Sequence, residues 1–373
     1  MKKLLGILVI IAVAVTCFIH FGQGKKSKPA DNSKPVIKIG ATLPLSGDFG
    51  HIADSNMKAL TLALDELKNK NTKFTYELVF EDDNGTSKQG ALNVAKLVNI
   101  DKVKAIISMW GLVGPVAGDI AGKSKIIHFG CGSGKGISAP HYSFNNYTPP
   151  HKSAELVIDK LKKSSVQKIA VVVSNSAPGD DISSALVEAA NKKGVGVVSV
   201  EKFMPGTKDF RIAIAKMDKD NPDIYIAWLY VPDIKIFVNQ LHQVTGKRNV
   251  ASIDAFHELN ASDYPVVEGL WFTKSAAGTP EFADKLLREK GAEIQSCTGN
   301  SYDSLNIIIN AYENTPIKDG NVFPLVDDIR DTILKSKSNE GALGGYYINE
   351  ERVIVSEPTL NVIKNGKIIE LKE

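Results

Sequence analysis

Cysteine is scarce in this chain, which excludes a fold held together mainly by disulfides. The sequence has three cysteines among 373 residues, and one of them, Cys17, lies in an apolar N-terminal run. A small cross-linked extracellular module would need many more. The other two, Cys131 and Cys297, either pair in an oxidising compartment or stay as buried free thiols, and the residues alone leave both alternatives open.

A nucleotide-binding loop is also missing, although the stretch GCGSGKGIS at residues 130–138 resembles one at first sight. The P-loop pattern G-x-x-x-x-G-K-[ST] would need glycine at Phe129 and a hydroxyl at Gly136. The dinucleotide pattern G-x-G-x-x-G would need glycine at Lys135. The loop therefore predicts no nucleotide cofactor, and its glycines need another explanation.

Enzyme and metal signatures are absent as well. The pattern G-x-S-x-G fails around Ser133, because Cys131 and Lys135 occupy its glycine positions. HELNA, which begins at His257, lacks the second histidine of the zinc motif H-E-x-x-H. The seven histidines are scattered and no C-x-x-C pair occurs, so neither a catalytic site nor a metal site is expected.

Neither sign of charge dominates the chain. The formal net charge is +3, and the lysines are spread rather than gathered in a stripe, so no nucleic-acid partner is predicted. Arginine is rare beside lysine and is missing from the loops that follow the predicted strands. A forked clamp for phosphate or a dianion is therefore not expected.

One long apolar run is present, at residues 4–21, directly after Lys2 and Lys3. A positive start followed by such a run is typical of a secretory signal, and 18 residues also approach the length of a spanning helix. We therefore predict a signal peptide or N-terminal anchor over residues 1–24. Residues 25–35 are polar and predict a disordered tether.

The fate of this N-terminal segment has three alternatives. Gly22 and Gly24 supply small residues for cleavage, the uncleaved run would serve as an anchor, and Cys17 would be the site of lipidation in a lipoprotein. Thr16 before that cysteine departs from the small residue that lipoprotein signals prefer. In each case the protein is expected to be exported, to the periplasm or to the outer face of the cytoplasmic membrane.

Strand-like runs alternate with helical patterns from residue 36 onwards. This alternation predicts an α/β fold with parallel sheets covered by helices on both faces. About 335 residues exceed one core, so we expect two doubly wound lobes. Ligands of such sheets bind beyond the carboxyl ends of the strands, where the glycine-rich loop lies. The clearest predicted strands are 36–44, 74–82, 104–109, 125–130, 168–174 and 223–230.

Five stretches, taken in order, carry a family resemblance. They are IGATLPLSGDFGHIADSNMKALTLALDELK, FEDDNGTSKQGALNVAKLV, ISMWGLVGPVAGDIAGKSKIIHFGCGSG, MPGTKDFRIAIAKMDKDNPDIYIAWLY and NSYDSLNIIINAY. From residue 36 to its end the chain resembles a type I periplasmic substrate-binding protein of the branched-chain amino acid and amide-binding (Leu/Ile/Val-binding protein-like) family of ABC importers.

The resemblance implies a periplasmic-binding-protein-like type I fold whose two lobes are joined by three chain crossings. These would fall near NNYTPP, WFTK and LGGYY, which contain residues that punctuate structure. The N-lobe would comprise residues 36–147 and 274–344. The C-lobe would comprise residues 148–273 and 345–373.

Residues of the first lobe that the resemblance assigns to a ligand site lie on two loops. Ser133 corresponds to a hydroxyl donor, and Cys131 to a backbone contact two residues earlier. Gly111 corresponds to a helix-start N–H donor, where relatives often carry serine or threonine. Such N–H groups bind carboxylates. Trp110 is expected either to stack on the ligand or to pack as a hydrophobe.

The remaining site residues are implied with an alternative for each. Tyr230 and Tyr302 are similar to tyrosines on the C-lobe that line the crevice between the lobes, or are half-buried packing residues. Asp254 is the carboxylate nearest in the sequence to the family's acidic residue for the ligand ammonium group, either at that position or one residue away from it. Pro178 stands where relatives often carry an aromatic residue.

The function implied is that of an exported solute-binding protein of an ABC importer. It would capture a small amino acid, amide or carboxylate between its lobes by hinge closure, act as a monomer without a cofactor, and deliver the ligand to a membrane permease. The alternative is a ligand-sensing module for a membrane receptor, since the same two-lobed fold serves both.

Overall fold

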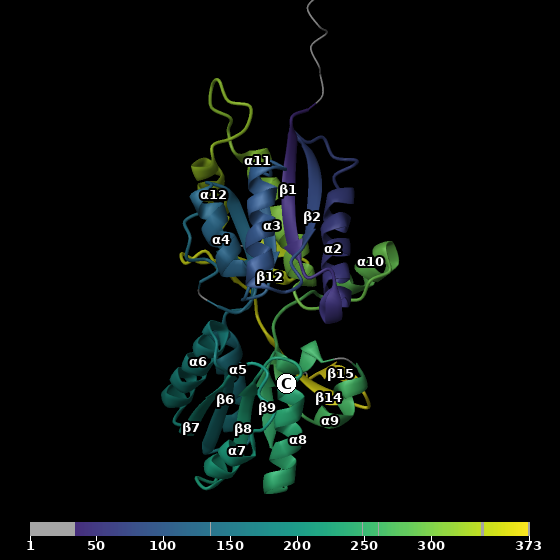
Figure 1. Ribbon diagram of the computed structural model, residues 1–373. Coiled ribbons are helices and arrows are strands. Elements are labelled where there is room, and N and C mark those ends of the chain that lie inside the picture. Colours follow the sequence, from purple (N-terminus) through teal and green to yellow (C-terminus); the bar gives the residue numbers. More distant parts are fainter. Residues whose placement is uncertain (1–33, 135, 248, 260, 337–338, 372–373) are drawn as a thin grey trace, which may run out of the picture. The chain divides into compact units, whose positions relative to one another are not determined.

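Two sheets organise the described chain, each with its own helices (Figure 1). The computed structural model describes residues 34–134, 136–247, 249–259, 261–336 and 339–371. The predicted signal or anchor at residues 1–24, and nearly all of the tether, lie outside these ranges. Within them, no helix combines the length and apolar character needed to cross a membrane.

The first sheet has five parallel strands in the order β2-β1-β3-β4-β5. Its strands are β1 (Val36–Leu43), β2 (Thr75–Asp82), β3 (Ala105–Met109), β4 (Ile127–Cys131) and β5 (Ser143–Asn145). Helices α3 (Ser87–Asn99) and α4 (Gly114–Lys123) cover one face. The other face carries α2 (Gly50–Asp65), α11 (Thr298–Asn314) and α12 (Val326–Lys335). Because both faces are covered, every residue of a central strand such as β3 is buried, and all of them except Ser108 are apolar.

The second sheet has seven strands in the order β15-β14-β10-β9-β8-β6-β7. Five are parallel: β6 (Lys168–Ser174), β7 (Gly196–Phe203), β8 (Ile224–Trp228), β9 (Val250–Ile253) and β10 (Trp271–Lys274). At one edge, β14 (Thr359–Lys364) and β15 (Lys367–Glu370) add an antiparallel pair. The helices of this lobe are α5 (Pro150–Lys163), α6 (Ala177–Lys193), α7 (Arg211–Asp218), α8 (Asp233–Thr245) and α9 (Tyr264–Val267).

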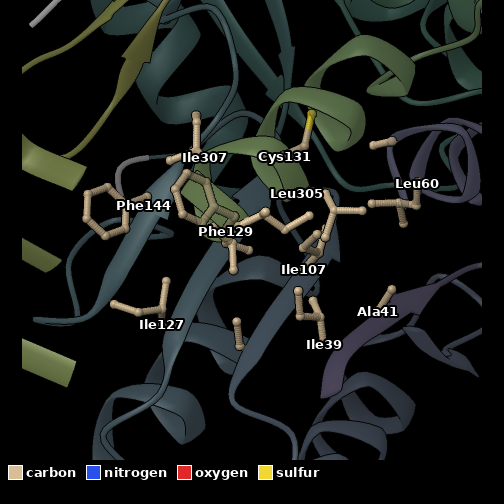
Figure 2. Packing of buried hydrophobic residues seen from close by; sticks show 14 of the residues in the cluster. Ile39, Ala41, Leu60, Ile107, Ile127, Phe129, Cys131, Phe144, Leu305 and Ile307 are labelled. Atoms are coloured by element: carbon tan, nitrogen blue, oxygen red, sulfur yellow. The ribbon is translucent and has the colours of Figure 1, made fainter. Parts of the chain in front are cut away.

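Each sheet has a separate hydrophobic core. In the first lobe, Ile107, Phe129 and Leu305 are almost completely buried between the sheet and α11 (Figure 2). The rings of Phe129 and Phe144 stack with centroids 4.9 Å apart. The second sheet has apolar clusters on both faces, around Phe237 on one and around the buried side of α5 and α6 on the other.

The third crossing lies further along the chain than the sequence predicts. Tyr346, Ile348 and Ile354 belong to the first core, whereas Ile363 belongs to the second. The first two lie on β12 (Gly344–Ile348), which forms a small sheet with β11 (Asn339–Gly341) and β13 (Ile354–Val355). The assignment of residues 345–355 to the C-lobe is therefore corrected, and we place the crossing between β13 and β14.

Candidate functional site

Four of the seven predicted site residues lie at the ends of two neighbouring strands of the first lobe or on the loops that follow them. β3 ends at Met109 and β4 at Cys131, and these residues are paired in the sheet. Trp110 and Gly111 follow the first strand, and Ser133 follows the second. The Trp110 backbone N–H donates to the Cys131 carbonyl at 2.6 Å. The two loops therefore begin side by side.

Glycine is required where these loops touch. A Cβ atom on Gly111 would lie 2.3 Å from the Ser133 carbonyl oxygen, and one on Gly132 would lie 2.5 Å from the Gly111 nitrogen. Both neighbours are backbone atoms, which cannot rotate away. From the sequence, the bare backbone of this stretch was interpreted as giving access to a ligand. At these two positions it allows the loops to contact one another.

Trp110 combines an unusual backbone with an unpaired polar atom. Its φ of +71° lies in the left-handed region, where a bulky residue is an outlier of the kind that clusters at functional sites. The indole ring meets the Phe49 ring edge-on at a centroid distance of 4.6 Å. Its Nε1 atom is buried and has no hydrogen-bond partner among the described residues. Packing therefore explains the ring and leaves the N–H group available.

The Ser133 hydroxyl is a second buried polar atom at this place for which the described chain provides no partner. Asn145 Nδ2 donates to the Gly132 carbonyl at 3.0 Å and fixes the backbone just before it. An indole N–H can only donate, and a hydroxyl can donate or accept. A buried polar group left unpaired costs about 1–3 kcal/mol. The pair suits a ligand that brings an acceptor oxygen, such as a carboxylate.

A buried carboxylate supports the turn on which Trp110 packs. Asp83, directly after β2, accepts the Thr42 hydroxyl at 2.9 Å and the Gly85 N–H at 2.8 Å. Burial raises the pKa of Asp83 to about 6, while these two hydrogen bonds oppose the rise. A Cβ on Gly85 would lie 3.2 Å from the Trp110 ring. The carboxylate thus helps to hold this turn against the indole.

Asp254, predicted to meet a ligand ammonium group, joins two of the chain crossings. It is 4% exposed. Its Oδ2 accepts the Tyr147 hydroxyl at 2.8 Å and the Ser275 hydroxyl at 2.7 Å, and its Oδ1 accepts the Ser275 N–H at 2.6 Å. Protein donors therefore engage both oxygens of the carboxylate. This environment favours a structural role between the lobes.

Thr148 joins all three crossings. Its Oγ1 accepts the Ala276 N–H at 3.2 Å and lies 3.0 Å from Ser356 Oγ. These residues follow β5, β10 and β13, the last strands before each crossing. We use the name hinge cluster for the set Tyr147, Thr148, Asp254, Ser275 and Ser356. The family resemblance implied crossings near NNYTPP and WFTK but gave no side chains that connect them. The hydroxyl-bearing residues of this cluster could have been identified from the sequence by their positions beside the crossings.

The two predicted tyrosines lie in different surroundings. Tyr230 follows β8 and is half-buried, with its ring 4.9 Å from that of Trp228. Tyr302 lies on α11 and therefore in the first lobe, so its predicted place on the C-lobe is corrected. Its hydroxyl donates to Glu66 Oε2 at 2.8 Å, and it lines a polar cavity of about 560 Å³ that none of the other predicted site residues lines. We do not include Tyr302 in the candidate site.

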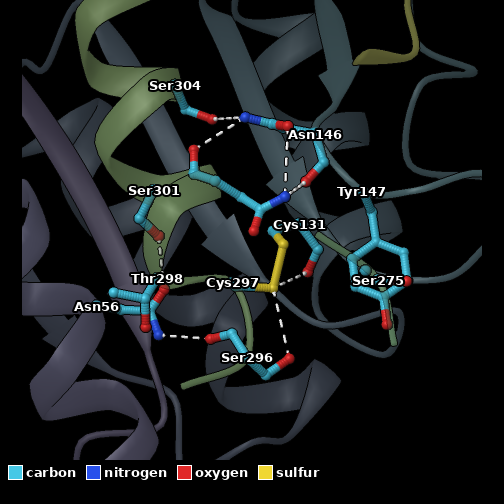
Figure 3. The surroundings of a disulfide bond; sticks show 12 residues. Asn56, Cys131, Asn146, Tyr147, Ser275, Ser296, Cys297, Thr298, Ser301 and Ser304 are labelled. Atoms are coloured by element: carbon cyan, nitrogen blue, oxygen red, sulfur yellow. Dashed lines mark hydrogen bonds between the residues drawn. A yellow bond between two sulfur atoms is a disulfide. The ribbon is translucent and has the colours of Figure 1, made fainter. Parts of the chain in front are cut away.

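Cys131 and Cys297 form a disulfide, which decides between the alternatives left open by the sequence (Figure 3). The bond connects the end of β4 to the start of α11. Cys131 therefore offers a ligand its backbone and not a thiol. In the described ranges no group of three or more histidine, cysteine, aspartate or glutamate side chains is arranged to hold a metal ion.

Comparison with known proteins defines the class to which this fold and site belong. A family model described as periplasmic binding protein matches residues 36–333, and the chain belongs to that family. Within it, the chain is a type I periplasmic binding protein of the branched-chain amino acid family, as the resemblance indicated. A Leu/Ile/Val-binding protein homolog of Brucella melitensis is 24% identical over 90% of this chain and 94% of its own length.

Solved structures confirm the fold. A leucine-binding protein of Thermotoga maritima has a TM-score of 0.77 and 20% identity, over 90% of this chain and 98% of its own. A solute-binding protein of R. palustris in complex with 4-hydroxybenzoate has a TM-score of 0.78 and 17% identity, over 91% and 96%. The predicted two-lobed α/β fold is confirmed. The family that matches the chain consists of binding proteins, which confirms the prediction that the chain is not an enzyme.

Proposed function

We propose that this protein is the exported solute-binding component of an ABC importer and that it captures a small carboxylate-, amide- or amino acid-type ligand. The observation that carries the proposal is the pair of buried, unpartnered atoms, Ser133 Oγ and Trp110 Nε1, at adjacent strand ends. Both can donate to one acceptor group. Backbone N–H groups of the same loops, including that of Gly111, would complete the site.

The ligand class follows from these donors. An acceptor oxygen is required, and a carboxylate forms hydrogen bonds of roughly twice the strength of neutral ones. The relatives have been solved with isoleucine, leucine, benzoate and 4-hydroxybenzoate, and the carboxylate is the one functional group that all four compounds share. Tyr230, from the strand ends of the second lobe, would supply a flat face and one hydroxyl on the other side of the ligand.

The mechanism proposed is hinge closure. A ligand bound to both lobes can favour a closed state only by the difference in its affinity for the closed and open states. The hinge cluster connects the three crossings. The backbone torsions of the three crossings would therefore change together when the lobes move. The membrane permease would then recognise the closed monomer. Export and attachment outside the cytoplasmic membrane remain proposals that rest on the sequence of residues 1–24.

Removing the Ser133 hydroxyl should weaken binding without weakening the fold. A thermal-shift panel of L-leucine, L-isoleucine, urea, acetamide, benzoate and 4-hydroxybenzoate would identify a ligand. A hundredfold excess over Kd adds about 2.7 kcal/mol of stability. Ser133→Ala should then bind about ten- to a hundredfold more weakly, since a hydrogen bond to a charged group contributes about 1.5–3 kcal/mol.

The matched control for this test is Ser124→Ala. Ser124 is exposed and follows α4 at the opposite end of the first sheet, so this variant should bind as the wild type does. If Ser133→Ala binds the identified ligand as tightly as the wild type, the site assignment fails.

Asp254→Asn separates the hinge role from the ammonium role. Tyr147 and Ser275 both donate to the carboxylate, and an amide nitrogen in its place would face donors. We expect a loss of about 1–3 kcal/mol of stability and an equal change in affinity for every ligand, measured by calorimetric titration of an amino acid and a simple carboxylate. A loss confined to the amino acid would restore the ammonium role.

A further inference from the structure

We propose that the Cys131–Cys297 disulfide positions the ligand site, so that ligand affinity and the redox state of this bond are thermodynamically linked. The inference rests on the proposed function for the identity of the ligand, and it adds redox regulation of the same site. The bond joins residues that are 166 positions apart in the chain. One of its ends is only two residues from Ser133.

The sulfur on the α11 side belongs to a segment that is held on α2 independently of the bond. Ser55 Oγ donates to the Glu293 carbonyl at 2.6 Å, and Asn56 Nδ2 donates to the Ser296 carbonyl at 2.8 Å. Ser301 Oγ donates to Asn56 Oδ1 at 2.7 Å (Figure 3). These contacts flank the cysteine on both sides. Cys297 therefore has a fixed position against α2, and we call it the anchored end of the disulfide.

The sulfur on the β4 side leads directly into the ligand loop. In the described chain, the backbone here is held by the Trp110 N–H on the Cys131 carbonyl and by the Asn145 amide on the Gly132 carbonyl. The Ser133 side chain has no partner. A shift of Cys131 would therefore move both unpartnered donors at once, Ser133 through the chain and Trp110 through its hydrogen bond. The disulfide thus connects Ser133 and Trp110 to the anchored end at Cys297.

Ligand binding and oxidation of the two thiols are linked equilibria, so the effect of each on the other must be equal in size. If oxidation of the two thiols favours the binding geometry by some factor, ligand binding must favour the disulfide by the same factor. Reduction by dithiothreitol transfers two electrons and two protons to the sulfur pair, which breaks the S–S bond and leaves two thiols, and the reagent becomes its cyclic disulfide. Both cysteines are almost completely buried, with exposures of 3% and 2%, so equilibration will be slow and must be followed to completion.

The ligand-independent part of the test uses Trp110 as the reporter. The chain has three tryptophans, and Trp228→Phe with Trp271→Phe leaves Trp110 alone. The wavelength of its emission maximum should shift when the bond is reduced in dithiothreitol, while the far-ultraviolet circular dichroism of the folded protein stays the same; intensity is not used, because a disulfide quenches a nearby indole directly. An unchanged wavelength of the Trp110 emission maximum after complete reduction, verified by thiol titration, would overturn the proposal.

The ligand-dependent part uses L-leucine and 4-hydroxybenzoate as probes with the full chain. We expect Kd to rise about tenfold on reduction, and saturating probe to lower the equilibrium constant for reduction by the same factor, which is about 30 mV for a two-electron couple. The double variant Cys131→Ala with Cys297→Ala should have the Kd of the reduced protein, and dithiothreitol should not change that Kd.

The outcomes distinguish this proposal from the function on which it rests. A bond with a purely stabilising role would change the melting temperature on reduction but leave Kd and the wavelength of the Trp110 emission maximum unchanged, which would refute the linkage and leave the proposed function intact. If the oxidised protein binds neither probe, the proposed function fails for these ligands. The emission maximum of Trp110 then still decides whether the disulfide positions the loop.

Discussion

Gly132→Ala is expected to weaken ligand binding by about a hundredfold or more. The new Cβ would lie 2.5 Å from the Gly111 nitrogen and 2.6 Å from the Trp110 carbonyl carbon, so the two loops must separate. A displacement of about 1 Å between positioned groups can cost two orders of magnitude in a functional site. Both unpartnered donors, on Ser133 and Trp110, belong to the loops that would move.

The same substitution should destabilise the first lobe by about 1–3 kcal/mol, which is typical of overpacking. Calorimetric titration and chemical unfolding would measure the two effects separately. The matched control is Gly136→Ala, because its Cβ would meet Pro115 at an ordinary 3.5 Å and the residue is exposed. Wild-type affinity in Gly132→Ala would show that contact between the loops does not determine the site.

Phe129→Ala should lower the free energy of unfolding of the first lobe by about 3–5 kcal/mol. Phe129 is fully buried, stacks on Phe144, and lies on β4 two residues before Cys131. Because the second lobe has a separate core, the first lobe of this variant should unfold at a lower urea concentration than the second. The fluorescence of Trp110 should therefore change at a lower urea concentration than that of Trp228.

Ile100→Ala provides the comparison for this core substitution. Ile100 belongs to the same lobe but is 71% exposed, so its truncation should change stability by no more than about 0.5 kcal/mol. A loss below about 1 kcal/mol for Phe129→Ala would contradict the packing of β4 against α11.

The sequence predicted the convergence of the two ligand loops because that convergence follows from regular structure. Once residues 104–109 and 125–130 are identified as neighbouring parallel strands, the residues after them must lie at one edge of the sheet. The family resemblance had assigned Trp110 and Ser133 to a ligand site, and the strand pairing accounts for their loops lying side by side. Their unpartnered atoms were not predicted, since hydrogen-bond satisfaction depends on side chains from other parts of the chain.

The third crossing, the contacts of Asp254 and the disulfide depend on interactions that no local pattern encodes. The third crossing was placed too early because the residues of β12 are punctuated by glycine, although Tyr346 and Ile348 complete the first core. Asp254 was matched to a family position by its order in the chain, and its partners Tyr147 and Ser275 come from two different crossings. Likewise, a separation of 166 residues gave no local signal for the disulfide.

The most direct test of the central claim is a crystal structure of the protein with the ligand that the thermal-shift panel identifies. We predict an acceptor oxygen of that ligand within about 2.7–3.2 Å of both Ser133 Oγ and Trp110 Nε1, the range of ordinary hydrogen bonds. Asp254 should keep its contacts with Tyr147 and Ser275. A ligand bound elsewhere, with the Ser133 hydroxyl and the Trp110 indole N–H still unpartnered, would contradict the account.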